Sequence, residues 1–352
     1  MAVSKGRCRV KSRAATIRDV ARVANLSVAS VSRALNGHDN VTPATRERVM
    51  KAAATLSYVP NAAAQSLSRA ETRTVGIVVP DLHGEFFSEL IRGFDMAASE
   101  GGYLLLLSTM HADPVLAGQA LRAMHGRVDG LLVMAPQLRA AELDALIPAD
   151  LPCLQVFSEA SRRRPTIGVD NRSGARDAAR HLFATGRRRI VHVTGPRGNH
   201  DAEERREGFV EALRALGAEP PVLLDGNFRE DGGARAVEEL IAMGTRFDAV
   251  FAANDMMALG AMQALRGHGL RVPEDVAVVG FDDIPLARHL GLTTMRVQAA
   301  EIGADALQRL IAILRNGPAA PTLRQVPPTL VVRASSGGTQ DDGDSVTAPD
   351  MG

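Results

Sequence analysis

The chain has 352 residues, 45% of them apolar, which is enough for two or three domains with cores of their own. It contains only two cysteines and no apolar run near the ~18 residues needed to cross a bilayer, so we expect neither a disulfide framework nor a membrane-spanning helix. The first ten residues lack the apolar segment of a signal peptide, which indicates a cytoplasmic protein. Residues 1–73 carry 13 lysines and arginines against four acidic residues, a net charge of +9, whereas the rest of the chain carries 28 against 36, a net charge of −8. This division predicts a polyanionic partner for the amino-terminal part.

Three short helical patterns follow a basic arm at residues 1–15. We expect the arm to be disordered, and either to add non-specific phosphate contacts or to have no role. Thr16 and Asp19 form a capping box at the start of the first helix, and Asn25 lies in the tight turn that ends it. A second helix begins after this turn, and Thr42-Pro43 begins a third. Two short helices joined by a tight turn are typical of a helix-turn-helix, although a protein-binding three-helix bundle is an alternative.

Residues 16–60 are therefore predicted to be a DNA-binding headpiece. The second helix of a helix-turn-helix lies in the major groove, where its first residues meet base edges. Arg33 can form a bidentate contact to guanine, and the small apolar side chains of Val28 and Ala29 suit a thymine methyl group. Hydroxyl and amide side chains around these helices are expected to contact the DNA without reading its sequence: Thr16, Ser27, Asn36, Thr42, Thr45 and Tyr58.

This stretch resembles the headpiece of the LacI/GalR (lac-repressor) family. It contains T-I-x-D-V-A-x-x-A-x-x-S-V-A-x-V-S-R-x-L-N, then V-x-x-x-T-R-x-x-V, then L-x-Y-x-P-N-x-x-A-x-x-L. The resemblance implies a hinge helix and linker at residues 61–74, with the helix at 61–68 and with Asn61, Ala64 and Leu67 at the DNA. Leu67 would be an apolar wedge that kinks the minor groove. The alternative is that Leu67 is a buried linker residue.

From residue 75 onward, strands and helices alternate. The apolar run Val75–Val79 ends at Pro80-Asp81, and a helical pattern covers Glu85–Gly101. Further strands are predicted at 103–108, 130–134, 153–157, 189–194, 222–224, 249–252 and 276–281, and further helices at 114–124, 140–146, 173–185, 202–216, 231–243, 256–267 and 301–314. The alternation predicts an α/β core of two doubly wound parallel-sheet units in tandem, behind the all-α headpiece.

The family resemblance continues through this core. It rests on V-G-I-V-V-P-D, R-R-R-I-x-H-V-x-G, F-x-A-N-D-x-M-A-L-G-A-M and V-A-V-V-G-F-D-D, and it implies a core similar to type I periplasmic sugar-binding proteins. The resemblance therefore implies two subdomains, between which the chain crosses three times. The N-subdomain contains residues 75–169 and 299–325, and the C-subdomain contains residues 170–298 and 326–333. The tail at 334–352 has no leucine repeat, so we expect it to be disordered and to lack the tetramer-forming helix of the family's namesake. The resemblance therefore implies a homodimer.

Ligands of such sheets bind at the carboxyl ends of the strands, here between the two subdomains. Asp81 follows the first strand of the core, and the match to the family motifs implies that Arg205, Asn254 and Asp282 hold a small effector. Aromatic side chains at Phe86, Phe157 and Phe228 can offer apolar faces to a sugar ring.

Several of these residues have a simpler interpretation. The alternative for Arg205 is that it is a solvated residue on its helix and does not bind effector. Asp255 is expected to cap the helix that follows it. Asn199, His200 and Asp201 can also touch ligand. Three departures from the family pattern leave the effector open: Gly84-Glu85 replaces Asn-Pro, Phe157 stands where many members have an acidic residue, and Val297 replaces Gln.

The sequence gives little evidence that the protein is an enzyme. No lysine follows Lys51, which excludes a P-loop and a Schiff-base lysine from the core, and the nine histidines form no H-E-x-x-H motif, so we expect no cofactor and no metal. The predicted function is a transcriptional regulator that binds palindromic double-stranded operator DNA, most simply a repressor of a carbohydrate catabolic operon that responds to a sugar. A regulator that responds to a nucleoside, polyol or sugar acid is the alternative, followed by a cytoplasmic sugar-binding protein.

Overall fold

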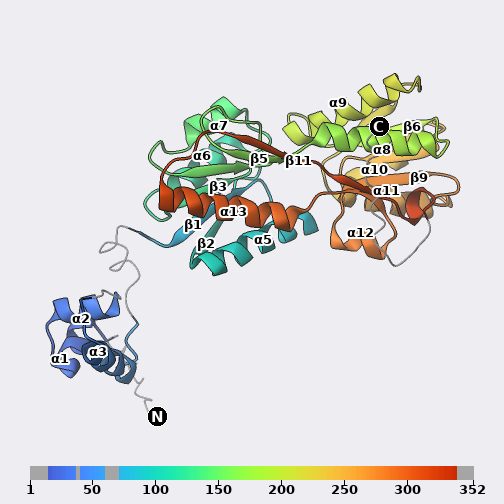
Figure 1. Ribbon diagram of the computed structural model, residues 1–352. Coiled ribbons are helices and arrows are strands. Elements are labelled where there is room, and N and C mark those ends of the chain that lie inside the picture. Colours follow the sequence, from blue (N-terminus) through green and yellow to red (C-terminus); the bar gives the residue numbers. More distant parts are fainter. Residues whose placement is uncertain (1–14, 37–39, 60–70, 339–352) are drawn as a thin grey trace, which may run out of the picture. The chain divides into compact units, whose positions relative to one another are not determined.

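The computed structural model describes residues 15–36, 40–59 and 71–338, which belong to two separate units that divide between Thr72 and Arg73 (Figure 1). The basic arm, the hinge helix with Asn61, Ala64 and Leu67, and the tail beyond residue 338 lie outside the described residues.

The first unit contains the three predicted helices, α1 (Ile17–Ala24), α2 (Val28–Leu35) and α3 (Pro43–Thr55). The Asp19 carboxylate accepts hydrogen bonds from the Thr16 backbone N–H at 3.0 Å and hydroxyl at 2.8 Å, which satisfies the start of α1. Asn25 ends that helix in the left-handed region at φ 51°, so the chain turns sharply into α2. One side chain or more from each helix enters a single small core, which includes Val20, Val31 and Val49.

The second unit is built on two six-stranded sheets. The first contains β1 (Thr74–Val79), β2 (Leu104–Thr109), β3 (Gly130–Val133), β4 (Cys153–Val156), β5 (Thr166–Val169) and β11 (Leu323–Val326) in the order β11-β5-β4-β3-β1-β2. The second contains β6 (Ile190–Thr194), β7 (Val222–Asp225), β8 (Ala249–Ala252), β9 (Ala277–Asp282), β10 (Thr293–Arg296) and β12 (Thr329–Val331) in the order β12-β10-β9-β8-β6-β7. The ladders are parallel except that between β10 and β12.

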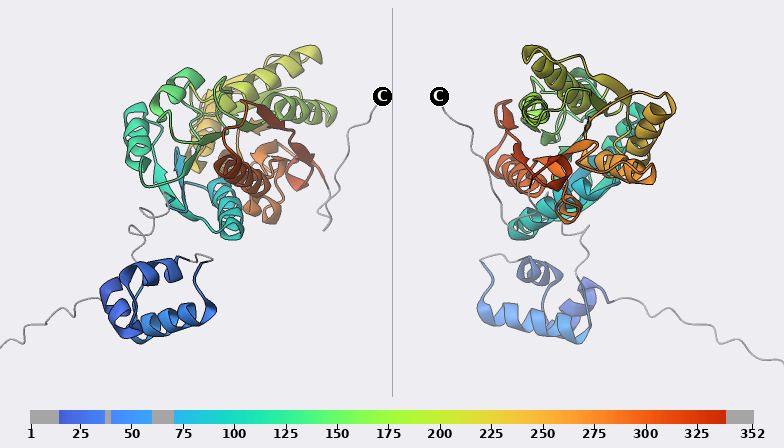
Figure 2. Two further views of the ribbon diagram at one scale, coloured as in Figure 1. Left: turned by 60° about the vertical axis from the view of Figure 1, so that its left-hand side comes forward. Right: turned by 90° about the vertical axis from the view of Figure 1, so that its right-hand side faces the viewer.

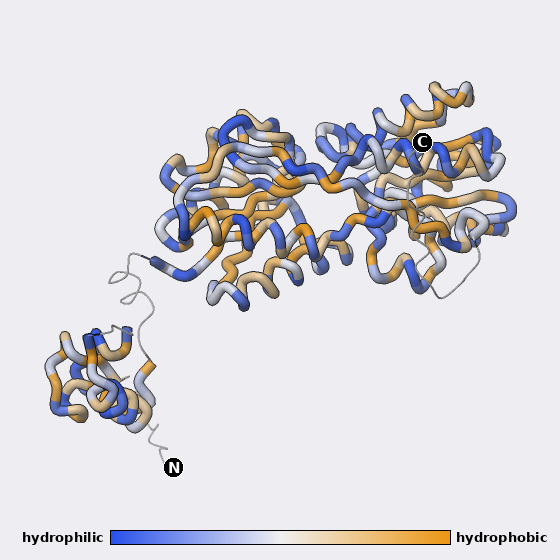
Figure 3. Tube along the Cα trace, viewed as in Figure 1, coloured by the Kyte–Doolittle hydropathy of each residue, from blue (hydrophilic) through white to orange (hydrophobic). Residues whose placement is uncertain are grey.

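Helices cover both faces of each sheet, as two doubly wound units require (Figures 1 and 2). The first sheet carries α5 (Glu85–Gly101), α6 (Pro114–Met124), α7 (Ala140–Leu146) and α13 (Ala299–Asn316), and the second carries α8 (Asn171–Ala184), α9 (His200–Ala215), α10 (Glu230–Ala242), α11 (Asp255–Gly267) and α12 (Pro285–His289). Alternate strand residues face opposite layers: Val75, Ile77 and Val79 of β1 join one buried cluster, whereas Val78 joins another. Because both faces are covered, β1 is buried from Val75 to Val79 and has no polar side chain after Thr74 (Figure 3).

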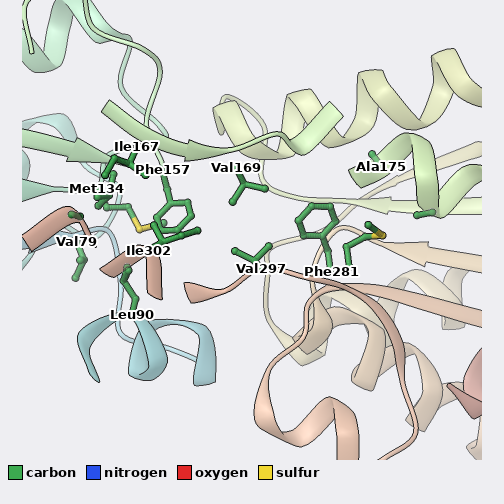
Figure 4. Close-up of a cluster of buried hydrophobic side chains, with 14 of the residues drawn as sticks. Val79, Leu90, Met134, Phe157, Ile167, Val169, Ala175, Phe281, Val297 and Ile302 are labelled. Atoms are coloured by element: carbon green, nitrogen blue, oxygen red, sulfur yellow. The ribbon is translucent and has the colours of Figure 1, made fainter. Parts of the chain in front are cut away.

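The two subdomains are joined by three crossings: from β5 into α8, from β10 into α13, and from β11 into β12. Val169 of the first crossing and Val297 of the second lie between the rings of Phe157 and Phe281, so one buried cluster runs through both subdomains (Figure 4). The cleft between the subdomains is therefore closed on one side by a continuous apolar core.

Three boundaries differ from those predicted. β1 begins at Thr74, which the sequence placed in the linker, and Val326 pairs with Val169 in the first sheet, whereas the sequence placed it in the C-subdomain. The tail was expected to be disordered from residue 334, but Ala334–Ser336 forms a short 3-10 helix. Ser335 is buried there because its hydroxyl accepts the Thr293 N–H at 2.8 Å and donates to the Val278 carbonyl at 2.6 Å.

Candidate functional site

Helix α2 presents an exposed surface suited to base edges. Ser27 caps the helix by accepting the Ser30 N–H at 3.1 Å, and Val28 beyond it is 42% exposed. Ala29 and Arg33 are exposed as well, whereas Val31 and Ala34 turn into the core. An apolar side chain and a guanidinium therefore stand together on the helix face that a helix-turn-helix places in the major groove.

The other predicted DNA contacts divide into two groups. Ser27 and Thr42 are exposed N-cap residues, and the Thr42 hydroxyl accepts the N–H of the half-buried Thr45 at 3.3 Å. Thr16, Asn36 and Tyr58 are half-buried: the Thr16 hydroxyl donates to Asp19, the Asn36 amide to Ser32 Oγ at 3.3 Å, and Tyr58 packs on the core. These three side chains stabilise the headpiece whether or not they also meet phosphate.

A cavity of about 310 Å³ lies between the two subdomains at the carboxyl ends of their strands. All seven residues predicted from the sequence to hold an effector line this cavity: Asp81, Phe86, Phe157, Arg205, Phe228, Asn254 and Asp282. Asp81, Phe86 and Phe157 come from the N-subdomain and the other four from the C-subdomain, so a molecule bound here touches both.

Arg205 is the centre of the polar network in this cavity. It lies on α9, is 6% exposed, and its guanidinium covers the Phe281 ring with 3.8 Å between Cζ and the ring centroid. Nε donates to Asn171 Oδ1 at 2.8 Å and Nη1 to the Ala253 carbonyl at 2.6 Å, while Asp282 Oδ1 lies 3.6 Å from Nη1. Arg205 is therefore a buried, oriented cation and not a solvated helix residue; a guanidinium has five N–H donors, so further donors are left for a ligand.

Backbone strain is concentrated around the cavity. Phe157 has φ 45° and Phe228 has φ 63°, in the left-handed region that bulky side chains rarely adopt. Asp282, with φ 121°, shares this property. Conformations of this kind cost on the order of 1–3 kcal/mol each and persist where the surroundings hold them, most often at functional sites.

Comparison with known proteins gives matches for both the headpiece and the core. Residues 16–61 match the model of bacterial regulatory proteins of the lacI family, and residues 179–336 match the periplasmic binding protein-like domain. The transcriptional repressor CytR of Escherichia coli K12 is 34% identical over 332 residues, which cover 92% of this chain and 96% of CytR. The chain belongs to the lacI family of bacterial regulatory proteins.

Solved structures of this family have the same architecture. The lac repressor dimer bound to operator and the anti-inducer ONPF superposes with a TM-score of 0.85 at 27% identity, covering 92% of this chain and 99% of that one. The complex of the regulator CelR with cellobiose gives a TM-score of 0.69 at 33% identity, over 91% and 99% of the two chains. The predicted family and fold class are thus confirmed, and the chain is a DNA-binding transcriptional regulator.

Asn254 lines the cavity as predicted and also caps α11, the role that the sequence assigned to Asp255. Asn254 caps α11 by accepting the Met257 N–H at 3.0 Å, and its amide donates to the Phe228 carbonyl at 3.0 Å, which helps to hold that strained residue. Asp255, predicted to be the cap, is fully buried and accepts the Thr294 hydroxyl at 2.6 Å and the Ile284 N–H at 2.9 Å. Asp255 thereby holds the turn that follows Asp282.

Burial governs the ionisation of these carboxyl groups. Desolvation raises the pKa of Asp282 to about 7, although the Arg205 charge acts in the opposite direction, and the nearby Asp201 carboxylate raises it further. Burial likewise raises the pKa of Asp255 well above its usual range, assisted by the charge of Asp282. Asp282 therefore changes its charge near neutral pH.

Four contacts bridge the mouth of the cleft. Arg229 Nη2 donates to Asp81 Oδ2 at 2.6 Å, and His83 Nε2 lies 2.9 Å from Glu230 Oε2. The Leu286 N–H donates to the Glu85 carboxylate at 2.9 Å, and the His200 N–H donates to the Pro136 carbonyl at 2.8 Å. These contacts join the two subdomains directly across the cleft.

The structure adds cavity residues that sequence reasoning missed. Met134 and Gln137 follow β3, His111 follows β2, and Met256 lies in the first turn of α11. Asn199 and Asp201, weighed as alternatives, line the cavity, whereas His200 is not among its lining residues. The rule that ligands bind beyond carboxyl ends of strands would have found the residues after β2 and β3.

The described parts of the chain contain no helix long and apolar enough to cross a membrane. Within those same ranges, no three histidine, cysteine or acidic side chains are grouped as metal ligands would be.

Proposed function

We propose that this regulator is a homodimeric repressor of a catabolic operon, whose hold on operator DNA is set by a neutral, hydroxyl-rich molecule in the interdomain cavity. The observation that carries the proposal is that polar and aromatic side chains of both subdomains converge on one cavity. A ligand that bridges them favours one relative arrangement of the subdomains, which is a hinge-type switch. We further propose that the ligand is bound without turnover, and that the protein acts where its operator is, in the cytoplasm.

The charges of the cavity favour a neutral ligand. Its two arginines already have carboxylate neighbours, Arg205 with Asp282 and Arg229 with Asp81. An anionic ligand would add negative charge to a cavity that also contains Asp201. Hydroxyl groups can donate to these carboxylates, and the Phe86, Phe157 and Phe228 rings can cover an apolar sugar or base face. A neutral sugar or a nucleoside therefore fits better than a sugar acid.

Two experiments test this function. Repeated selection from random duplex DNA should yield an inverted repeat, with binding that weakens steeply as salt is added. Thermal unfolding should then be followed with D-ribose, D-galactose, cellobiose and uridine, with D-gluconate as the anionic comparison. Stabilisation by a neutral compound is expected. Enrichment of no sequence would contradict the DNA-binding role, and stabilisation by gluconate alone would contradict the neutral ligand.

Ligand affinity should rise with pH across neutrality. Below pH 7 the buried Asp282 is mostly protonated, and above it the carboxylate accepts stronger, charge-assisted hydrogen bonds from hydroxyl groups. Between pH 6 and pH 8 the ionised fraction of a group with this pKa increases by about tenfold, and affinity should follow. Isothermal titration of the binding compound at both pH values measures this change. Asp282→Asn should remove it, and an unchanged slope in that variant would assign the titration to another group.

The edge strand β2 is the surface we propose for dimerisation. Leu104 is 71% exposed, Leu107 40%, and Val115 on the adjoining α6 66%. An apolar edge of this kind is normally covered by a partner. Leu107→Arg combined with Val115→Arg should give a monomer in sedimentation and weaken operator binding at least tenfold. Leu323→Arg on β11, the opposite edge of the same sheet, is the matched control because Leu323 is 51% exposed. A dimeric double variant would refute this surface.

A further inference from the structure

The turn after β9 carries strain that its own sequence does not explain. Asp282 and Asp283 have φ values of 121° and 57°, and glycine would adopt both without steric cost. Asp282 lines the ligand cavity, but Asp283 does not. Contact with ligand therefore does not explain the aspartate at position 283, but the residues around it do.

Asp283 lies between two arginines. Its Oδ2 accepts a hydrogen bond from Arg296 Nε at 2.6 Å, and its Oδ1 lies 2.7 Å from Arg333 Nη1. The Asp283 side chain is 9% exposed, that of Arg296 25% and that of Arg333 14%. Ion pairs this sheltered are screened less by solvent than surface pairs. We call Asp283, Arg296 and Arg333 the arginine clamp.

Both arginines lie close in the chain to segments that cross between the subdomains. Arg296 is the last residue of β10, and only Val297 and Gln298 separate it from α13 in the N-subdomain. The Val297 N–H donates to the Asp282 carbonyl at 3.0 Å, which ties the second crossing directly to a cavity residue. Arg333 follows β12, the strand that receives the third crossing, and its side chain also donates to the Leu292 carbonyl at 2.8 Å.

The first crossing reaches the same network from the other side. Asn171 opens α8 two residues after β5 ends, is 1% exposed, and accepts from Arg205 while it donates to Asp201 Oδ1 at 2.9 Å. Backbone atoms join the first and third crossings, since the Asp170 N–H donates to the Val326 carbonyl at 3.0 Å. The first crossing is thus bonded to Arg205 and the second to Asp282, and the third is bonded to the first beside Asn171.

We propose that Arg296 and Arg333 are positioning residues that couple the cavity to the hinge. Rotation of one subdomain against the other changes backbone angles in the crossings, and the clamp links those changes to the turn that presents Asp282. The clamp therefore sets how strongly ligand alters operator affinity. This inference rests on the proposed function, because it concerns the coupling between two sites that the proposal assigns.

Arg296→Met tests the clamp, since methionine keeps the apolar stem and removes the charge. Operator binding is measured by fluorescence anisotropy on the selected duplex, with and without saturating D-ribose, D-galactose, cellobiose or uridine. In the wild type, a bound compound should change operator affinity by about 5- to 150-fold. In Arg296→Met this change should shrink at least fivefold, while operator affinity without compound stays within threefold of wild type.

Two further variants separate coupling from mere stability. Arg309→Met on α13 is the matched control, because Arg309 forms an ion pair with Asp305 on the same helix and should leave the coupling unchanged. Arg296→Met combined with Asp283→Asn should lose less coupling than the sum of the losses in the two single variants, since both substitutions remove the same contact between Arg296 and Asp283. Arg296→Lys should restore part of the coupling.

Three results of these experiments would refute the coupling role of the arginine clamp. If a compound binds the wild type and changes operator affinity equally in Arg296→Met, the clamp is refuted and the proposed function stands. If Arg296→Met loses operator binding without compound together with thermal stability, the arginine is structural and the inference falls. If none of the four compounds binds the wild type, the proposed ligand class fails, and the inference fails with it.

Discussion

Replacing Arg205 with methionine should abolish the ligand response while the protein still binds its operator. The guanidinium is buried beside Asp282 and already makes two hydrogen bonds to the protein, so it meets a ligand as a pre-oriented donor. Charge-assisted hydrogen bonds contribute about 1.5–3 kcal/mol each, so the loss of two should weaken binding by 100-fold or more. Isothermal titration with the stabilising compound measures this loss.

Arg206→Met is the control for this experiment. Arg206 is the next residue of α9, it is exposed, and it is not among the residues that line the cavity. Its variant should bind ligand and operator as the wild type does. If Arg205→Met also loses operator binding at unchanged thermal stability, the residue acts in DNA release and not in ligand recognition. Retention of ligand affinity by Arg205→Met would disprove the assignment of the cavity.

Local sequence signals were sufficient for most elements of the fold. The helices α5, α6 and α7 have the predicted bounds because each is delimited by local signals, such as Gly102 after α5 and Asp113, which caps α6 by accepting two backbone N–H groups. Strands β5, β10, β11 and β12 were not predicted, because no local signal of this kind marks them. β11 is LRQV with three exposed residues, and it becomes a strand only because β5, far earlier in the chain, offers it a parallel ladder.

The cavity was only partly predictable for a related reason. Residues such as Asp81 and Asp282 stand at strand ends, and family motifs mark Arg205, so local position and resemblance were enough to select them. The buried position of Asp255 depends on Thr294 and Ile284, which reach its carboxylate only after the sheet has formed. The hydrogen bonds of Asn171 and the ion pairs of Arg333 are likewise invisible until the crossings bring distant segments together.

Arg33→Ala should reduce affinity for the selected operator by about 30-fold or more, because a dimer on an inverted repeat loses two bidentate contacts to guanine, each of about 1–3 kcal/mol. Arg33 is exposed near the end of α2, and its Nε lies 3.4 Å from the Ala29 carbonyl one turn earlier, so its outer guanidinium nitrogens remain for base edges. Because a base contact is lost and phosphate contacts are kept, affinity for random duplex should change by less than threefold. Titration of both duplexes at two salt concentrations measures the two effects separately.

The matched control is Arg22→Ala in the same module. Arg22 lies on α1 and pairs with Asp19 on its own helix, so its removal should leave both affinities nearly unchanged. Selection from random DNA with the Arg33→Ala protein should relax the preference at one base pair of each half-site and keep the spacing of the inverted repeat, since spacing depends on the dimer and not on this side chain. Equal losses on operator and random duplex would show that Arg33 meets phosphate, and reading of the base would then have to come from Val28, Ala29 and their neighbours on α2.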